Sequence, residues 1–402
     1  RVGKRKGKKV PRTPLRALGE IRKLIAEARL LAIESDEYSE LTDQLPEIAE
    51  RLEELVGRQT GAKRLSKGLL LPLNVYERPR TGGIERTEEF EKKGLATYAV
   101  NVGLGCGHGC FYCSSPSLRR MHELFQELES SAFTTGIAIV DPETPDRLRR
   151  DIPALTEQDV VQVCTLDDAW SPEARQHRLG RRCLEVVLEE TPAQVRVLTK
   201  SHHVQEEFEL IRKYRDRVIV GLSTGAPASR ERVAQVIEPN ASSVSERLKT
   251  LQLANKMGLR TFGMICPALP GIGDSRHALE EMFRAVLKCR PETIWLEPVN
   301  RRGDGLPKTS AALRLAGYRD EAAAVDHIRD ENHWSGYTTA LIKQAIDVAC
   351  SNRVLDRLKI LLYPDKLSPE HRAELEKYDQ GIVWLIRERS TADSASETPA
   401  AR

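Results

Sequence analysis

The sequence predicts an α/β protein built around a parallel β-sheet. Six short runs rich in valine, isoleucine and threonine alternate with longer stretches whose apolar residues recur at helical spacing. Every gap between two runs is long enough for the helical crossover that parallel neighbours require. Alternation of this kind is typical of a parallel sheet covered by helices.

The six predicted strands fall in one continuous part of the chain, residues 96–300. They are Thr97–Val102, Val160–Cys164, Gln194–Thr199, Val218–Ser223, Thr261–Cys266 and Thr293–Glu297. Helices are predicted between them over residues 119–129, 174–190, 203–213, 245–257 and 275–288. We therefore assign residues 96–300 to one core domain.

The N-terminal part, residues 1–95, has a different character. Residues 1–16 carry eight Lys or Arg and no acid, which suits contact with nucleic-acid phosphates, and a solvated tail is the alternative. Helical spacing then predicts one helix over residues 15–35 and a second over 36–56. The second helix is interrupted at Pro46, because proline cannot donate a backbone N–H. We expect a basic arm and a helical extension ahead of the core.

The C-terminal part, residues 301–389, predicts a smaller α/β extension. Helices near residues 338–351 and 369–377 flank the apolar run Lys359–Tyr363, which suits an added strand. The small, polar residues 390–402 predict a disordered tail.

The composition is that of an ordinary globular protein. Of the 402 residues, 40% are hydrophobic and 30% are charged, with a net charge of +3. No apolar run approaches the roughly 20 residues that span a bilayer, and the basic N-terminus lacks the apolar stretch of a secretion signal. Eight cysteines in such a chain predict reduced thiols, so we expect a cytoplasmic protein. The first residue is Arg1 and not Met, which is typical of a fragment or a processed form.

Three cysteines follow the first predicted strand at the spacing C-x-x-x-C-x-x-C. Cys106, Cys110 and Cys113 lie in the run GCGHGCFYC, residues 105–113. An iron–sulfur cube needs four ligands, so three thiolates leave one iron open to bind a reactive molecule. The alternating glycines let the backbone wrap closely around such a cluster.

A zinc site is the alternative interpretation of this run. Three cysteines and one histidine are a common closed set of zinc ligands, and His108 lies between two of the cysteines. However, structural zinc usually draws its ligands from two separated pairs, and a ligand inside one tight loop is strained. The spacing therefore favours a [4Fe–4S] cluster over zinc.

The cysteine run resembles the cluster loop of the radical SAM superfamily, including the aromatic Tyr112 just before the third cysteine. The resemblance implies that the open iron holds S-adenosylmethionine (SAM), which the reduced cluster cleaves to a 5′-deoxyadenosyl radical. It also implies a low-potential electron donor of the flavodoxin or ferredoxin type. The expected fold is a partial (β/α)6 radical SAM barrel with N-terminal helical and C-terminal α/β extensions, and catalysis at the C-terminal ends of its strands.

Short motifs spread over residues 96–300 resemble spore photoproduct lyase and the wider group of photolyase-like radical SAM proteins. In order along the chain, they are VCTLD at residues 163–167, Thr199-Lys200, Leu222-Ser223, Ile237-Glu238-Pro239, Ser242-Ser243 with Arg247-Leu248, and Cys266-Pro267-Ala268. The resemblance implies a lyase-like enzyme acting on DNA or RNA, in DNA repair or base modification.

The resemblance implies roles for four residues outside the three cysteines. Lys200 would bind the carboxylate of SAM, Ser223 would hydrogen-bond its amino-acid end, and Tyr112 would pack near the adenine. Cys164 would return a hydrogen atom to the product radical, since an S–H bond is weaker than most C–H bonds. The alternative in each case is structural: a solvated lysine, a capping hydroxyl, a core tyrosine, or a thiol packed on a strand.

The chain also departs from the lyase pattern. Ser114 stands where the lyase has a tyrosine after its last cluster cysteine, Leu166 stands where it has a serine, and its DNA-binding hairpin has no clear counterpart after residue 300. We expect residues 297–303 to form a substrate-facing rim, with a turn and helix cap as the alternative. Residues 331–334 are the other segment found in place of the hairpin.

Three further residues after the second predicted strand, Asp167, Asp168 and Trp170, are expected to face the site. Two competing functions stay open at this point. One is the same radical chemistry on a peptide or a small metabolite, because fold resemblance does not decide a substrate. The other is a non-catalytic binding module stabilised by zinc or by a cluster.

Overall fold

The computed structural model describes residues 74–79, 82–127, 137–378 and 382–384. Three sequence predictions lie outside these residues: the basic arm 1–16, the helices over 15–56 and the tail 390–402. No described helix combines the length and hydrophobicity that a membrane crossing requires.

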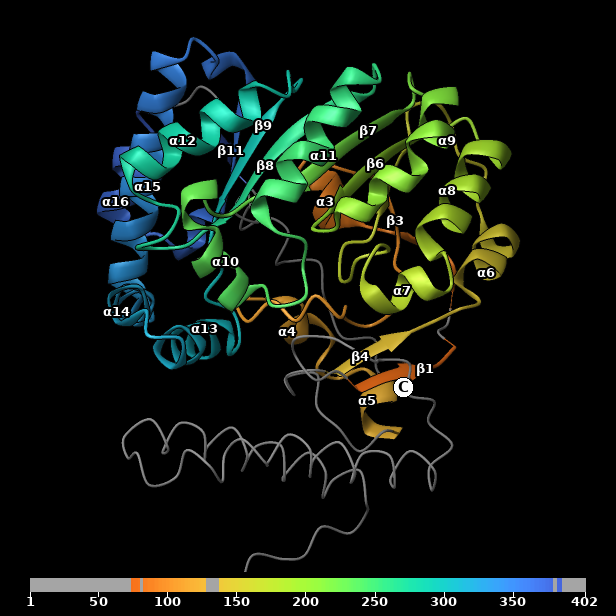
Figure 1. Ribbon diagram of the computed structural model, residues 1–402, viewed down its shortest axis with the longest axis horizontal. Helices are drawn as coiled ribbons and strands as arrows, with labels where there is room; N and C mark the ends of the chain where they lie inside the picture. Colours follow the sequence, from red (N-terminus) through yellow and green to blue (C-terminus); the bar gives the residue numbers. More distant parts are fainter. Residues whose placement is uncertain (1–73, 80–81, 128–136, 379–381, 385–402) are drawn as a thin grey trace, which may run out of the picture.

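A mostly parallel sheet forms the centre of the described structure (Figure 1). Its strand order is β11-β10-β9-β8-β7-β6-β5-β3-β2. All six predicted strands are present: β3 (Tyr98–Val100), β5 (Val160–Val163), β6 (Gln194–Thr199), β7 (Val218–Ser223), β8 (Arg260–Ala268) and β9 (Ile294–Pro298). They lie side by side in chain order and pair in parallel, which confirms the α/β fold class.

The sheet extends beyond the six predicted strands at both edges. The apolar run near residue 360 forms β10 (Leu358–Leu362), which pairs in parallel with β9, and β11 (Ile382–Trp384) pairs in parallel with β10. At the other edge, β2 (Glu85–Arg86) runs antiparallel to β3. The C-terminal extension therefore continues the core sheet.

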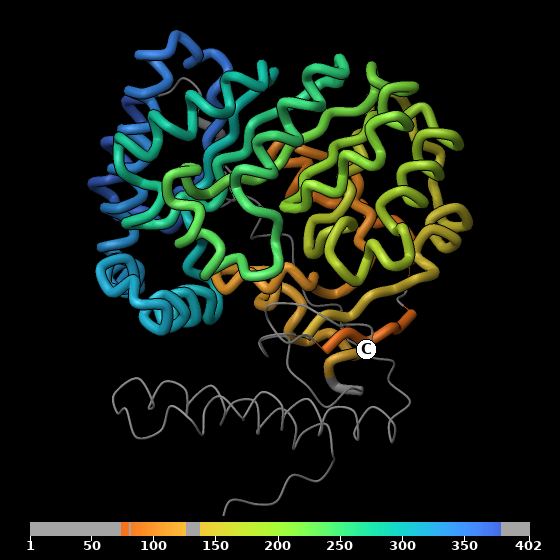
Figure 2. Tube along the Cα trace, in the orientation of Figure 1, coloured from red at the N-terminus to blue at the C-terminus, as the bar shows by residue number. Residues whose placement is uncertain are grey.

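A separate two-stranded sheet lies at the strand-end side of the fold (Figure 2). It pairs β1 (Asn74–Glu77) with β4 (Ile137–Val140) in parallel. We did not predict β1, β2, β4 or β11. β2 is too short to show a period of two, and β1 lies in a stretch of mixed composition with turn signals at Pro72 and Pro79.

Helices cover one face of the sheet (Figure 1). The helices with the most extensive strand contacts are α8 (Leu179–Glu190) on β5, α11 (Val244–Lys256) on β7 and β8, α12 (Arg276–Leu287) on β8, and α15 (Glu331–Ser351) on β10. On the opposite face lies α3 (Glu88–Lys92), whose Phe90 packs against a cluster that contains Phe262. We call the face that most helices cover the outer face of the sheet, and the face on which α3 lies the inner face.

The structure corrects three predicted helices. Residues 119–129 do not form one helix; α4 (Ser115–Arg119) and α5 (Glu123–Glu127) take their place. The predicted helix 174–190 is divided into α7 (Pro172–Gln176) and α8, because Arg178 between them adopts the left-handed conformation with φ 52°. Residues 203–213 begin as a 3₁₀ turn, His202–Glu207, before α9 (Phe208–Lys213).

Other helices were not predicted or were predicted too short. The helices without a prediction are α3, α6 (Thr144–Asp151), α10 (Glu231–Ile237), α13 (Gly305–Leu315) and α14 (Arg319–His327). The helix predicted over 338–351 begins earlier, at Glu331, so residues 331–334 form its first turn. The remaining helices, α11, α12 and α16 (Pro369–Leu375), agree with their predictions to within a residue or two.

The inner face of the sheet is tightly packed below the strand ends. A Cβ atom at Gly221 of β7 would lie 2.3 Å from the ring of Phe262 on β8. The guanidinium of Arg196 on β6 stacks on the same ring, with its central carbon 3.7 Å from the ring centroid. Phe262 therefore cannot move away without disturbing a second close contact.

We predict that Gly221→Ala destabilises the protein by about 1–3 kcal/mol, because the added methyl overpacks the inner face. Gly336→Ala in the middle of α15 is the matched control: its Cβ would meet the nearest side-chain atom at 3.6 Å. The control should raise stability by up to about 1 kcal/mol, since alanine is the better helix former. Urea unfolding followed by circular dichroism measures both, and equal stabilities for the two variants would contradict this packing.

Candidate active site

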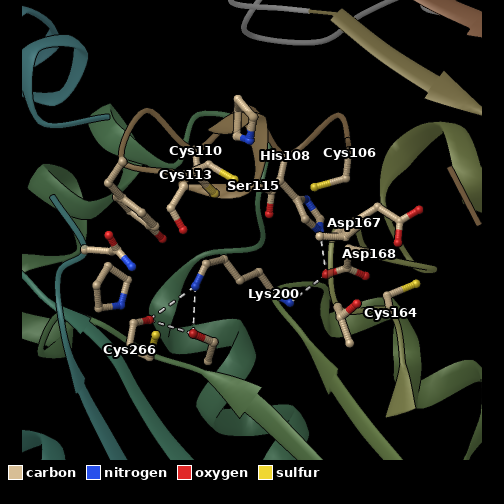
Figure 3. A pocket seen from close by; sticks show the side chains of 18 of the residues that line it. Cys106, His108, Cys110, Cys113, Ser115, Cys164, Asp167, Asp168, Lys200 and Cys266 are labelled. Carbon is tan, nitrogen blue, oxygen red and sulfur yellow. Dashed lines mark hydrogen bonds and ion pairs between the residues drawn. The ribbon is translucent and has the colours of Figure 1, made fainter. Parts of the chain in front are cut away.

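A cavity of about 330 Å³ opens where the parallel strands end. Its wall is formed by the loop after β3, the ends of β5 to β9 and the start of α13. The sequence-predicted site residues that line it are Cys106, Cys110, Tyr112, Cys113, Cys164, Lys200 and Ser223 (Figure 3). Residues from three different strand ends and one loop are therefore brought together at a single cavity.

The cysteine loop presents three free, half-buried thiols to this cavity. Two of its glycines adopt a left-handed backbone, Gly105 with φ 103° and Gly109 with φ 65°, which a side chain would strain. The loop is fixed at Gly107, whose N–H donates to Glu173 Oε1 at 2.7 Å, and at Phe111, whose N–H donates to the carbonyl of Ile237 at 3.0 Å. The cysteines therefore stand on an anchored backbone.

The two ring nitrogens of His108 contact other protein groups, so His108 does not join the three cysteines as a metal ligand. Its Nε2 lies 3.0 Å from Asp168 Oδ2 and its Nδ1 lies 3.3 Å from the carbonyl oxygen of Asn240. Burial lowers the pKa of His108, but the charge of Asp168 outweighs it and raises this pKa. Both ring nitrogens are therefore engaged, and neither is available as a zinc ligand.

The three cysteines suit a multinuclear cluster better than a single ion. Among the described residues, no three His, Cys, Asp or Glu side chains converge on one point as the ligands of a single metal ion must. In an iron–sulfur cube each cysteine binds a different iron, so the three thiols need to face one cavity and not one point. Cys106, Cys110 and Cys113 meet that requirement (Figure 3).

Asp168 joins the cysteine loop to the end of β6. Besides facing His108, it accepts hydrogen bonds from Thr199 Oγ1 at 2.8 Å and from the backbone N–H of Lys200 at 3.0 Å. Burial raises its pKa, but the charge and hydrogen bond of His108 outweigh burial, so the pKa of Asp168 is lowered. The carboxylate thus stays ionised and sets the position of the Lys200 backbone.

Lys200 and Ser223 lie together on the cavity wall. The Nζ of Lys200 donates to Ser223 Oγ at 2.7 Å and to the carbonyl oxygen of Cys266 at 3.3 Å. Ser223 Oγ in turn donates to the same carbonyl at 2.6 Å. The ends of β6, β7 and β8 are therefore linked through one ammonium group and one hydroxyl (Figure 3).

Behind this pair lies a buried carboxylate, Glu238. It forms an ion pair with Arg247, accepts a hydrogen bond from the hydroxyl of Tyr112, and lies 3.5 Å from Lys200 Nζ. Burial raises the pKa of Glu238, but the charges of Arg247 and Lys200 outweigh it and lower the pKa to about 2. Two cations against one anion leave one excess positive charge at the wall, which suits an anionic ligand group.

Cys164 lies at the opposite side of the cavity from Cys266 (Figure 3). Its backbone has a left-handed φ of 64°, and its N–H extends the β3 pairing by donating to the carbonyl of Val100 at 2.8 Å. The side chain is 5% exposed and lines the cavity. Burial, followed by the charge of Asp167, raises the pKa of the thiol well above its usual value, so the sulfur keeps its proton.

The segment after β9 forms part of the cavity rim, as expected for residues 297–303. Glu297 and Asn300 line the cavity together with Asp304 and Lys308 of α13, and the last two form an ion pair of 2.8 Å. Residues 331–334 have a different place: Trp334 is buried and its Nε1 donates to the carbonyl of Val299 at 2.8 Å. This hydrogen bond holds the backbone of the rim at Val299 in place.

A family comparison agrees with this site. Residues 100–285 match the model of the radical SAM superfamily, and the matched range begins in β3 and contains all three cysteines. Residues 100–285 form a radical SAM domain. Proteins of this superfamily are enzymes that use a [4Fe–4S] cluster and SAM and need an electron donor. These are the cofactors of the domain, and its cavity offers the three cysteines that such a cluster takes.

The chain is also similar to several uncharacterised proteins. It is 24% identical over 252 residues to ORF301 of Acidianus two-tailed virus, covering 61% of this chain and 79% of that protein. It is 23% identical over 186 residues to MJ0683 of Methanocaldococcus jannaschii, covering 46% and 66% respectively. For Rv2578c of Mycobacterium tuberculosis the identity is 23% over 208 residues, covering 51% and 59%. The chain therefore spans about three fifths to four fifths of these relatives.

Among solved structures, the chain resembles spore photoproduct lyase with bound SAM and dinucleoside spore photoproduct. The identity is 14% and the TM-score 0.43, covering 67% of this chain and 78% of that one. SuiB of Streptococcus suis bound to SAM is 9% identical with a TM-score of 0.30, covering 80% and 64%. Scores this low carry no inference about substrate or residue roles.

Several residues of the radical SAM domain were missed by the sequence analysis, or named without a role. Glu238 and Arg247 stood in matching motifs, but their pairing joins residues nine positions apart in the sequence and was not predicted. Glu173 gave no signal at all, because an exposed and a buried glutamate look alike in a sequence. Asp168 was expected to face the site, and its bonds to His108 and Lys200 came from the structure.

We predict that Glu238→Gln destabilises the protein at pH 7 by about 3–5 kcal/mol, because it leaves Arg247 buried without its counter-charge. In the unaltered protein, the folded pKa of Glu238 lies near 2, below its unfolded value. The stability it contributes is therefore present above about pH 4.5 and is lost as the pH falls toward 2.

Denaturant unfolding between pH 2 and pH 7 measures this contribution. Glu281→Gln, which changes a surface glutamate hydrogen-bonded to Ser229, is the matched control and should cost less than about 1 kcal/mol. Equal losses in the two variants at pH 7 would contradict the role given to Glu238.

Proposed function

We propose that this protein is a radical SAM enzyme that abstracts a hydrogen atom from a nucleic-acid substrate, in lyase-like repair or base modification. The observation that carries the proposal is the pairing of three free cysteines with the Lys200–Ser223 pair across one cavity. When bound, the reduced cluster and SAM supply a 5′-deoxyadenosyl radical. The chain itself has to hold both cofactors, orient the substrate and exclude water.

The cavity residues divide this work in a simple way. Cys106, Cys110 and Cys113 bind three irons of the cluster and leave the fourth iron to SAM. Lys200 attracts the carboxylate of SAM, since Arg247 already neutralises Glu238 and leaves the charge of Lys200 uncompensated within this triad. Ser223 offers its hydroxyl to the same end of the ligand. Tyr112, whose hydroxyl is held by Glu238, keeps its ring available for contact with the adenine.

Cys164 keeps the role that the resemblance gives it, the return of a hydrogen atom to the product radical. Two observations support this: the side chain lines the cavity, and burial keeps the sulfur protonated. The residue also sits within the hydrogen-bonded end of β5, which holds the thiol in a fixed position.

A nucleic-acid substrate is supported by charge. The eight cations of residues 1–16 suit a phosphate backbone, and Arg301 and Arg302 follow β9 next to the rim of the cavity. The lyase-like motifs point to a photolesion or a modified base as the first substrate to test. We further propose a flavodoxin- or ferredoxin-type electron donor and a cytoplasmic location, which agrees with eight free cysteines.

We predict that anaerobically reconstituted protein holds about four irons and four sulfides per chain. Replacing Cys106, Cys110 or Cys113 by Ala should abolish the brown absorbance and all cleavage of SAM. Cys350→Ala, at an exposed cysteine, is the matched control and should change neither. One bound zinc per chain without iron would favour a zinc-stabilised binding module. A triple-alanine variant that still cleaves SAM would disprove the assignment.

We predict that Lys200→Ala leaves the cluster assembled and weakens SAM binding by about 1.5–3 kcal/mol, the usual cost of losing a charged hydrogen bond. The corresponding loss of affinity is roughly 10- to 150-fold. Equilibrium dialysis of the cluster-loaded protein measures it. Lys256→Ala at the exposed end of α11 is the control and should bind normally. Unchanged affinity in the Lys200→Ala variant would show that Lys200 does not bind the carboxylate of SAM.

We predict that ultraviolet-irradiated DNA increases the release of 5′-deoxyadenosine from the reduced, cluster-loaded protein, because a bound substrate consumes the radical. Unirradiated DNA, RNA and a mixed peptide pool serve as the comparison. Stimulation by RNA alone would point to base modification, whereas stimulation by peptides alone would replace the nucleic-acid proposal with the peptide alternative.

A further inference from the structure

A second thiol faces the cavity across from Cys164. Cys266 lies near the end of β8, is half-buried, and lines the cavity wall beside Lys200 (Figure 3). All eight cysteines lie within the described residues, and apart from the three in the loop, those that line this cavity are Cys164 and Cys266. Neither sequence spacing nor resemblance had assigned a role to Cys266.

The main chain of Cys266 is fixed by the residues proposed to bind SAM. Its carbonyl oxygen accepts from Lys200 Nζ at 3.3 Å and from Ser223 Oγ at 2.6 Å. The two donors come from β6 and β7, so three strand ends meet at this one carbonyl. The thiol is therefore held next to the amino-acid end of the cofactor site.

The side chain of Cys266 is fixed by a carboxyl group. Its Sγ donates to Glu297 Oε2 at 3.1 Å, and Glu297 also lines the cavity. Burial, followed by the charge of Glu297, raises the pKa of the Cys266 thiol well above its usual value, while Lys200 acts in the opposite direction. Glu238, the other charged group that acts on this thiol, raises its pKa further. The sulfur therefore keeps its hydrogen, as a hydrogen-atom donor must.

Glu297 is half-buried, and its pKa depends on the charge of Lys93. Burial raises its pKa, while the nearby charge of Lys93 on the α3 side lowers it. The Nζ of Lys93 donates to Glu89 Oε1 at 2.7 Å and to the hydroxyl of Tyr363 at 3.3 Å. Glu89 has a half-exposed side chain, so this series of polar groups reaches solvent.

We propose that Cys266 is a second hydrogen-atom donor of this cavity, working beside Cys164, and that Glu297 is its proton source. The inference rests on the proposed radical function. The S–H bond of Cys266 breaks and a C–H bond forms on a carbon radical in the cavity, which reduces the carbon and oxidises the sulfur by one electron each. One electron from the low-potential iron–sulfur or flavin donor and one proton from Glu297 then restore the thiol. Glu297, which lines the cavity, then regains its proton from solvent.

The thiol–carboxyl pair is tested first in protein without cofactors. Alkylation of Cys266 by iodoacetamide, followed by mass spectrometry from pH 7 to pH 11, gives the pH at which the thiol ionises. Glu297→Gln removes a negative neighbour, so the midpoint should fall by about one pH unit. Glu281→Gln at the surface is the control and should leave it in place. A midpoint unchanged by Glu297→Gln would overturn the pairing.

The hydrogen transfer is tested in deuterated buffer, where the exchangeable S–H becomes S–D. The reduced, cluster-loaded protein with SAM and no substrate should release 5′-deoxyadenosine that carries one deuterium. Cys266→Ser should lower the deuterated fraction at least twofold, because the O–H bond of serine is too strong to donate a hydrogen atom, while its hydroxyl can keep the bond to Glu297. The double variant Cys164→Ser/Cys266→Ser should lose nearly all of it.

Cys289→Ser, at a buried cysteine remote from the cavity lining, is the matched control and should match the unaltered protein. If Cys266→Ser leaves the deuterated fraction unchanged, Cys266 is not a hydrogen-atom donor. Its thiol then has only a packing role. If no variant, including the unaltered protein, cleaves SAM, the proposed function itself fails, and the alkylation profile still reports on the Cys266–Glu297 pair. The outcomes are therefore distinguishable.

Discussion

The buried carboxylate of Glu238 is the interaction on which the site depends. It compensates Arg247, which is 1% exposed and would otherwise be an isolated buried charge, and it holds Tyr112 of the cysteine loop by its hydroxyl. The same carboxylate lies 3.5 Å from Lys200 at the end of β6. One anion therefore ties together a loop, a strand end and a helix, and leaves the wall with one excess positive charge.

Asp168 plays a corresponding part on the other side of the loop. It holds His108 by one ring nitrogen and the backbone of Lys200 by its N–H, so the cysteine loop is joined at His108 to the end of β6. The two buried carboxylates explain why the cavity can present thiols and an ammonium group in fixed positions. Burial raises the pKa of the Cys164 and Cys266 thiols, so both keep their protons, and it strengthens the buried ion pairs because the protein interior screens charges less than water does.

Much of the fold was predictable because its local patterns are strong. β6 and β7 have the predicted bounds, and α11 and α12 differ from prediction by a residue or two, since each shows several turns or pleats of regular spacing. The failures were short or interrupted elements. β2 has two residues, and the break between α7 and α8 depends on the left-handed backbone of Arg178, which helical periodicity does not reveal.

The cysteine spacing, the six strand runs and the residues that follow each strand can be read from the amino-acid sequence without a structure. Residue chemistry and periodicity are enough to predict these features. The C-terminal ends of parallel strands meet at the same edge of a sheet, so the residues that follow the strands are expected to lie close together. Tertiary structure alone decided that His108 faces Asp168, that Glu238 pairs with Arg247, and that the thiol of Cys266 meets Glu297 at 3.1 Å. These contacts join side chains distant in the chain, and their energies come from burial and charge, which only the folded molecule creates.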